Sequence, residues 1–93
     1  MRSHMPDANQ VQTYIAMHPE QFDRKGPLHV SNHVMHRTLG VTGSVTAINA
    51  PIHAQPRALV QLDDSNATPV SYAQHDLIKM AHVAGSPRLP WRM

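Results

Sequence analysis

The sequence contains no cysteine, and this absence removes several classes of function at once. Without thiols there is no disulfide, no thiol nucleophile and no cysteine-ligated zinc. Long apolar runs are also absent: no segment approaches the roughly 20 apolar residues that span a bilayer, and the first ten residues lack the apolar core of a signal peptide. We therefore expect a cytoplasmic protein with no membrane partner.

Aromatic residues are scarce, at 4% of the chain. Between residues 24 and 83 only Tyr72 is aromatic. Binding of single-stranded nucleic acid by stacking, aromatic cages for cations and grooves for proline-rich peptides all use several aromatic side chains. The sequence therefore argues against these three modes of recognition.

The chain has 93 residues, enough for one domain. A domain of this size buries only about 60% of the surface that its unfolded chain exposes, so its stability margin is thin. With no disulfide to offset this, burial of further apolar surface by self-association is expected. We predict a homo-oligomer.

The chain carries eight Lys and Arg residues and six Asp and Glu residues, which gives a formal net charge of +2. The cations are spread along the chain rather than gathered in one run, and eight histidines would add positive charge in mild acid. If the fold gathers the cations on one rim, they form a surface for nucleic acid. The predicted binding residues are Arg24, Lys25, Arg37, Arg57, Lys79 and Tyr72.

A helix is predicted over about residues 8–18, inside an N-terminal segment placed at 7–22. Asp7, with Gln10 three residues later, is the signature of a helix start in which each side chain bonds the other's backbone amide. The pattern fails where Pro19 pushes the preceding residue out of the helical region. Residues at the spacing of one helical face are Val11, Tyr14, Ile15 and His18.

Between residues 24 and 83 the chain alternates apolar and polar residues in short runs, which predicts strands. Turn-rich segments separate the runs, Gly40 and Gly43 are expected to bracket a tight turn, and AQHD supplies one helical turn before the last strand. The predicted strands are LHVSNHVMHR (28–37), residues 43–49, RALVQL (57–62), TPVSY (68–72) and LIKM (77–80).

The two ends of the chain are interpreted separately. The first five residues, MRSHM, resemble a remnant of an expression vector, so Arg2 and His4 are left out of the functional argument. Residues 84–93 hold Gly, Ser and two prolines, which predicts either a flexible extension or an arm that docks elsewhere. Trp91 favours docking as much as it favours a peptide ligand for a partner protein.

The run RTLGVTGSVTAI, followed by ALVQLDD, a turn and PVSYAQHDLIKM, resembles the SH3-like barrels of the KOW, Tudor and type II dihydrofolate reductase kind. In those families a GxxGxV element opens a strand, and a helical turn leads into the final strand. The resemblance covers about residues 28–80. It implies a mainly β fold, a small SH3-like barrel of about five short strands with an N-terminal helix. KOW-like barrels most often bind nucleic acid.

Type II dihydrofolate reductases build their active site at the symmetry axis of a tetramer, from a VQIY motif before the helical turn. This chain has VSYA at residues 70–73, where only Tyr72 is a partial match. The activity is therefore not transferred, although an enzyme formed only in the oligomer stays as an alternative.

The segment HVSNHVMH places His29, His33 and His36 within eight residues. On a helix they would share one face and suit a metal ion. On the predicted strand, His29 and His33 share a face about 13 Å apart, too far to share an ion, and His36 lies on the other face. We predict a solvated strand face and no metal site.

Two further patterns have simpler interpretations than catalysis. The acidic pair Asp63 and Asp64 is expected to form a hairpin turn rather than a cation site. Ser71, His75 and Asp76 carry the residue types of a catalytic triad, but neighbours in a short turn point apart, and Asp76 is expected to cap that turn.

These observations rank three functions. The first is a small binding or assembly module without enzymatic activity or cofactor, which self-associates and contacts nucleic acid or a partner protein. The second is the enzyme with a site at an oligomer axis. The third is a protein that senses metal or pH through its histidines.

Overall fold

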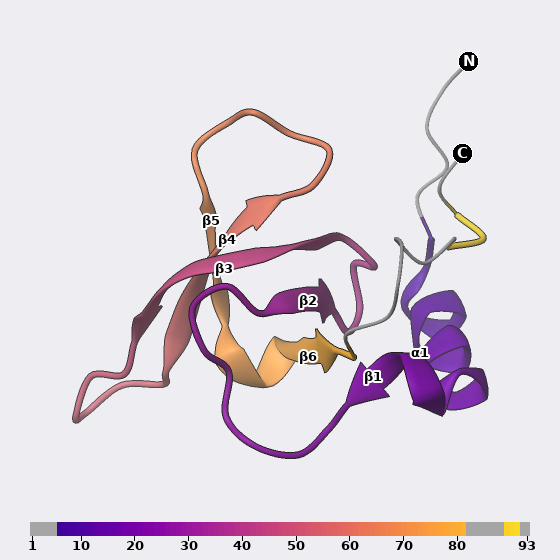
Figure 1. Ribbon diagram of the computed structural model, residues 1–93, viewed down its shortest axis with the longest axis horizontal. Helices are drawn as coiled ribbons and strands as arrows, with labels where there is room; N and C mark the ends of the chain where they lie inside the picture. The colour runs from indigo at the N-terminus through magenta and orange to yellow at the C-terminus, as the bar shows by residue number, and fades with distance from the viewer. Residues whose placement is uncertain (1–5, 82–88, 92–93) are drawn as a thin grey trace.

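The computed structural model describes residues 6–81 and 89–91. Six antiparallel strands form one sheet in the order β1-β6-β2-β3-β4-β5, with one α-helix (Figure 1). The mainly β fold is therefore confirmed. The elements are α1 (Ala8–Met17), the 3-10 turn η1 (Pro19–Gln21), β1 (Phe22–Asp23), β2 (His33–His36), β3 (Thr42–Asn49), β4 (Arg57–Leu62), β5 (Val70–Ala73), the 3-10 turn η2 (Gln74–Asp76) and β6 (Leu77–Met80).

The sheet does not close on itself. Strands β1 and β5 are its two edges, and no ladder joins them within the described part of the chain. The closed barrel is therefore not confirmed. The strand count is also one higher than predicted, because the two-residue β1 was not anticipated.

The helix begins and ends where the sequence predicts. The Asp7 carboxylate accepts a hydrogen bond from the Gln10 amide at 2.8 Å, and the Gln10 side chain accepts one from the Asp7 amide at 3.1 Å. This reciprocal pair satisfies two amides that a helix start would leave unpaired. The helix ends at Met17, two residues before Pro19.

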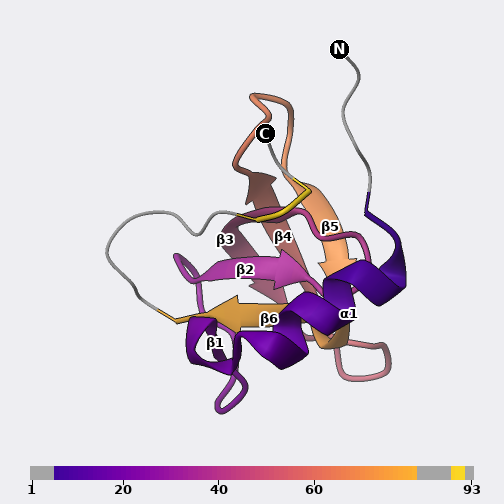
Figure 2. The ribbon, with the colours of Figure 1, turned by 90° about the vertical axis from the view of Figure 1, so that its right-hand side faces the viewer.

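The bent sheet holds apolar clusters on both faces. Figure 2 shows α1 in front of β2 and β6, with β3, β4 and β5 behind them. The inner cluster, which lies between the two halves of the sheet, contains Val34, Val45, Ala58, Val60 and Leu77. The outer cluster, which lies under α1, contains Val11, Tyr14, Ile15, Phe22, Met35, Ile78, Met80, Leu89 and Trp91.

The predicted strand over residues 28–37 is wrong in length and in exposure. Asn32 accepts a bond from the His29 amide at 2.8 Å, and Ser31 has a φ of 81°, so a turn replaces the first half. The remaining strand is covered on both faces, because Val34 enters the inner cluster while Met35 enters the outer one. The expected solvated face is therefore absent from β2.

Two other local predictions also change. Gly43 lies inside β3 rather than at a turn, whereas Gly40 does occupy a turn, with a φ of 74°. At the C-terminal end, Leu89 and Trp91 are buried in the outer cluster, so this part of the predicted tail is docked. The predictions for residues 1–5, 82–88 and 92–93 lie outside the described residues.

No helix in the described ranges is both long and apolar enough to cross a bilayer.

Candidate anion-binding groove

A groove of about 330 Å³ lies between the loop that follows β1 and the segment that runs from η2 into β6. Among the residues that the structure describes, three cations, one carboxylate and one histidine line it. Gly26, Pro27, Leu28, Pro56, Gln74, Leu77 and Ile78 supply the rest of its lining, and the charged and titratable residues are Asp23, Arg24, Arg37, His75 and Lys79.

The order of the strands brings these cations together. Strand β6 lies between β1 and β2, and Lys79 of β6 is opposite Asp23 on one side and Val34 on the other. Arg24 directly follows β1 and Arg37 directly follows β2. Three positions far apart in the sequence therefore meet at one end of three adjacent strands.

Asp23 anchors the loop that forms one wall. Its carboxylate accepts a bond from the Lys25 amide at 2.9 Å and lies 3.5 Å from the Lys79 ammonium. The bond from the Lys25 amide, assisted by the charge of Lys79, lowers the pKa of the Asp23 carboxyl below its ordinary value. Asp23 therefore stays ionised and offsets part of the positive charge.

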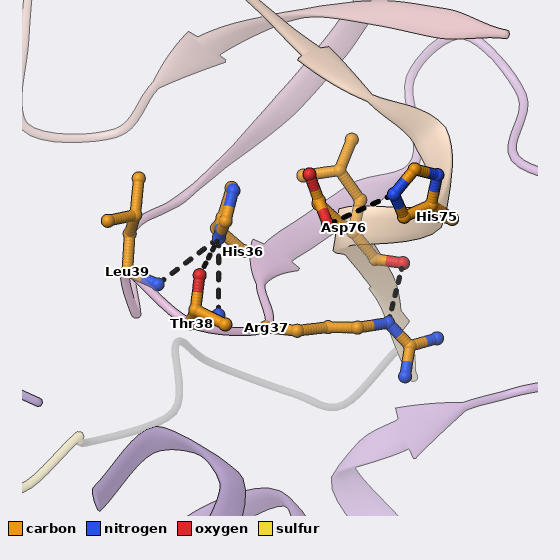
Figure 3. Close-up of polar contacts among 7 residues, drawn as sticks. His36, Arg37, Thr38, Leu39, His75 and Asp76 are labelled. Atoms are coloured by element: carbon orange, nitrogen blue, oxygen red, sulfur yellow. Dashed lines mark hydrogen bonds and ion pairs between the residues drawn. The ribbon is translucent and has the colours of Figure 1, made fainter. Parts of the chain in front are cut away.

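The two arginines of the groove differ in how firmly they are held. The Nε of Arg37 donates to the Leu77 carbonyl at 3.4 Å (Figure 3). The Arg37 amide donates to the Asp76 carbonyl at 2.7 Å. Among the described residues, its terminal guanidinium nitrogens have no partner. Arg24 is exposed, and no hydrogen bond or ion pair of its side chain is found in the described ranges. Both guanidinium groups are thus available to an anion.

The other predicted binding residues lie outside this lining. Lys25 is exposed next to Arg24. Arg57 crosses to β5, where its guanidinium donates to the Ser71 hydroxyl at 2.8 Å and to the Ser71 carbonyl at 3.1 Å. Tyr72 packs against the inner cluster and meets the His36 ring edge-on, with centroids 4.9 Å apart. The predicted rim is therefore divided between the groove and the far strands.

The three histidines of HVSNHVMH do not converge. His29 is exposed in the turn before β2. His33 contacts Asp63, with Nε2 and the carboxylate oxygen 2.7 Å apart, and Thr42 donates to the same oxygen at 2.7 Å. His36 is buried, at 7% exposure. Within the described ranges no group of three or more His, Asp or Glu side chains could hold a metal ion.

The Ser, His and Asp residues near η2 do not form a triad. The Ser71 hydroxyl is engaged by Arg57, while the His75 ring lies 3.4 Å from the Asp76 carboxylate rather than near Ser71. Asp76 does not cap the turn through its side chain, contrary to expectation. Instead, η2 contributes His75 to the groove, a role that the sequence pattern gave no reason to assign.

Comparisons with models of protein families, with curated proteins and with solved structures found no match to this chain. The resemblance to SH3-like barrels therefore stays a prediction from sequence. The case for a function depends on the groove and on the packing around it.

Proposed function

We propose that this protein is a small binding module that holds the phosphate backbone of a nucleic acid in its basic groove, without enzymatic activity. The observation that carries the proposal is the meeting of Arg24, Arg37 and Lys79 in one groove whose lining contains a single carboxylate. Neutralising phosphates with such side chains releases counterions, which is the main source of sequence-independent affinity.

The two arginines suit this ligand better than a single point charge would. A guanidinium group presents paired N–H donors that match the spacing of two phosphate oxygens. The long bond of 3.4 Å from Arg37 to the Leu77 carbonyl orients the side chain along the groove before a ligand arrives, which reduces the conformational freedom lost on binding.

The aromatic residues support contact with the backbone rather than with bases. Tyr14, Phe22 and Trp91 are buried in the outer cluster, and Tyr72 packs on the inner one. These four are all the aromatic residues of the chain. Three of the rings are buried and Tyr72 is half-buried, so no group of exposed rings is left on which bases could stack, and we expect little dependence on base sequence.

Salt titration tests the proposal. Three phosphate contacts predict that affinity for duplex DNA falls about 40-fold between about 50 and 200 mM salt, and about 20-fold for a single strand. Fluorescence anisotropy with labelled duplex and single-stranded oligonucleotides measures both slopes. Absence of binding at the lower salt concentration would remove the proposal.

Two variants, compared by their loss of affinity per charge removed, locate the contact. Arg24→Gln combined with Lys79→Gln is expected to lower the salt slope by about two ion contacts, because both cations line the groove. Arg57→Gln removes a cation that lies elsewhere and should leave the slope unchanged. If both variants lose the same affinity per charge removed, the attraction is diffuse and no groove is involved. Thermal unfolding of each variant checks that it is folded.

We also propose that two copies associate through the free edge of β5. In the described part of the chain β5 pairs with β4 alone, and none of its four residues, VSYA, is charged. Arg57 of β4 donates to the Ser71 carbonyl, so pairing with a second copy would displace this bond. Val70 is 37% exposed there. Sedimentation velocity over a concentration series should show a dimer that Val70→Lys dissociates and that Ile52→Lys, in the exposed loop after β3, does not. A wild-type chain that stays monomeric at all concentrations would refute this.

A further inference from the structure

The turn after β2 is built around the side chain of His36. The Nδ1 atom of His36 accepts hydrogen bonds from the Thr38 amide at 3.2 Å and the Leu39 amide at 3.1 Å, and lies 3.1 Å from the Thr38 hydroxyl (Figure 3). Backbone amides only donate, so Nδ1 carries no proton and the ring is neutral with its hydrogen on Nε2.

The same turn carries the docking point of the C-terminal segment. The Gly40 amide donates to the His36 carbonyl at 3.0 Å, and the His36 amide donates to the Val41 carbonyl at 2.9 Å. The Gly40 carbonyl then accepts a bond from the indole Nε1 of Trp91 at 3.1 Å. Gly40 is closely packed, since a Cβ there would lie 3.0 Å from both Val11 and Trp91. The positions of His36 and Trp91 are thereby linked through one turn.

We propose that protonation of His36 opens this turn and releases Trp91, so that the chain contains an acid-sensitive latch for this side chain. A protonated Nδ1 donates and cannot accept. The Thr38 hydroxyl can rotate to accept from it, but the amides of Thr38 and Leu39 cannot. These two donors must move away, and Gly40 moves with them.

The groups that face His36 determine whether its pKa is raised or lowered. Tyr72 approaches from β5 as a neutral ring, and Asp76 of η2 supplies a carboxylate, itself paired with His75. Arg37, next in sequence, directs its charge to the Leu77 carbonyl. Burial lowers the pKa of the His36 imidazole below its ordinary value, and Asp76 opposes this only in part.

The pH dependence of docking follows from the difference between the pKa of His36 in the docked state and in the released state. A released, solvated His36 has the ordinary pKa of about 6.5 and binds a proton more readily than the docked one. The docked state is therefore fully favoured above about pH 6.5 and is progressively lost as the pH falls through the lowered pKa of His36.

Trp91 is the only tryptophan of the chain and reports its own release. As the pH is lowered from about 7.5 to about 4.5, a range that brackets histidine titration, we expect the fluorescence emission of Trp91 to shift to longer wavelength. Acrylamide should also quench this emission more efficiently. Far-UV circular dichroism should stay unchanged over the same range. Loss of the dichroism signal with the same midpoint would mean general acid unfolding and would overturn the latch.

Two histidine variants separate the latch from other titrations. His36→Asn keeps an oxygen that can accept from an amide two residues on, as in an Asx turn, but does not titrate in this range. It should hold Trp91 docked at both ends of the range, whereas His53→Asn, in the exposed loop after β3, should respond as the wild-type chain does. An acid shift that persists in His36→Asn would overturn the proposal.

Nuclear magnetic resonance of the wild-type chain gives a test that needs no variant. The ring nitrogens of His36 should report the Nε2–H tautomer at neutral pH, and their titration should share its midpoint with the Trp91 indole resonance. Different midpoints for the two groups would show that the docking of Trp91 is independent of His36.

Discussion

Replacing Met35 by alanine is expected to lower the free energy of unfolding by about 2 to 5 kcal/mol, the range for removing a large buried side chain. Met35 lies in the middle of β2 with no exposed surface, and it packs in the outer cluster beneath α1. The surrounding strands and helix can collapse only partly into the space left behind. For a domain of this size such a loss is a large part of total stability, which is about 5 to 15 kcal/mol in most proteins.

A second methionine of the same chain is the matched control. Met17 ends α1 with 71% of its surface exposed, so Met17→Ala should change stability by less than about 0.5 kcal/mol. Urea denaturation followed by circular dichroism measures both variants, with an unchanged slope as the sign of an unaltered unfolded state. Similar losses for the two would mean that the outer cluster contributes little to folding.

The burial of Met35 could not be predicted from the local sequence pattern. Alternation in HVMH predicts that the two faces of the strand differ, but it cannot say whether a distant helix covers the second face. The helix itself could be predicted, because Asp7, Gln10 and Pro19 are local signals. Its position over β2 and β6 depends on tertiary packing, so the strand face that carries Met35, predicted to be solvated, is buried instead.

HVSNHVMH illustrates the same limit for the candidate sites. The sequence excluded a shared metal ion by a distance argument, yet gave no sign that Asn32 would form a turn or that His36 would be buried. Burial of His36 depends on β5 and η2, which lie more than 30 residues further along the chain.

The sequence predicts which cations could bind an anion, but not which of them line one groove. Arg24, Arg37 and Lys79 meet because β6, the last strand in sequence, inserts between β1 and β2. Nothing in a local pattern specifies that order. Arg57, chosen for the same reason as the others, lies on β4 and bonds β5 instead. Composition identified the charges, whereas strand order decided which of them act together.

Replacing Gly43 by alanine is expected to lower the free energy of unfolding by about 3 kcal/mol, toward the upper end for an overpacked interior. Gly43 lies inside β3, where a Cβ would come within 2.4 Å of the Gln61 carbonyl oxygen and 2.6 Å of a Val60 methyl group. The first obstacle is backbone, so no change of rotamer relieves it, and β3 must separate from β4. Elsewhere in a strand the same substitution stabilises by about 0.5 to 1 kcal/mol. A loss of stability, rather than a gain, therefore indicates that β4 lies too close to Gly43 for a Cβ.

Gly26 separates this steric effect from a conformational one. It has a φ of 82°, but a Cβ there would meet only the Lys79 ammonium, at 3.9 Å. Gly26→Ala should therefore cost about 1 kcal/mol, from backbone strain alone. Thermal and urea unfolding of both variants measure the difference. If Gly43→Ala proves no less stable than Gly26→Ala, the close approach of β3 to β4 is incorrect.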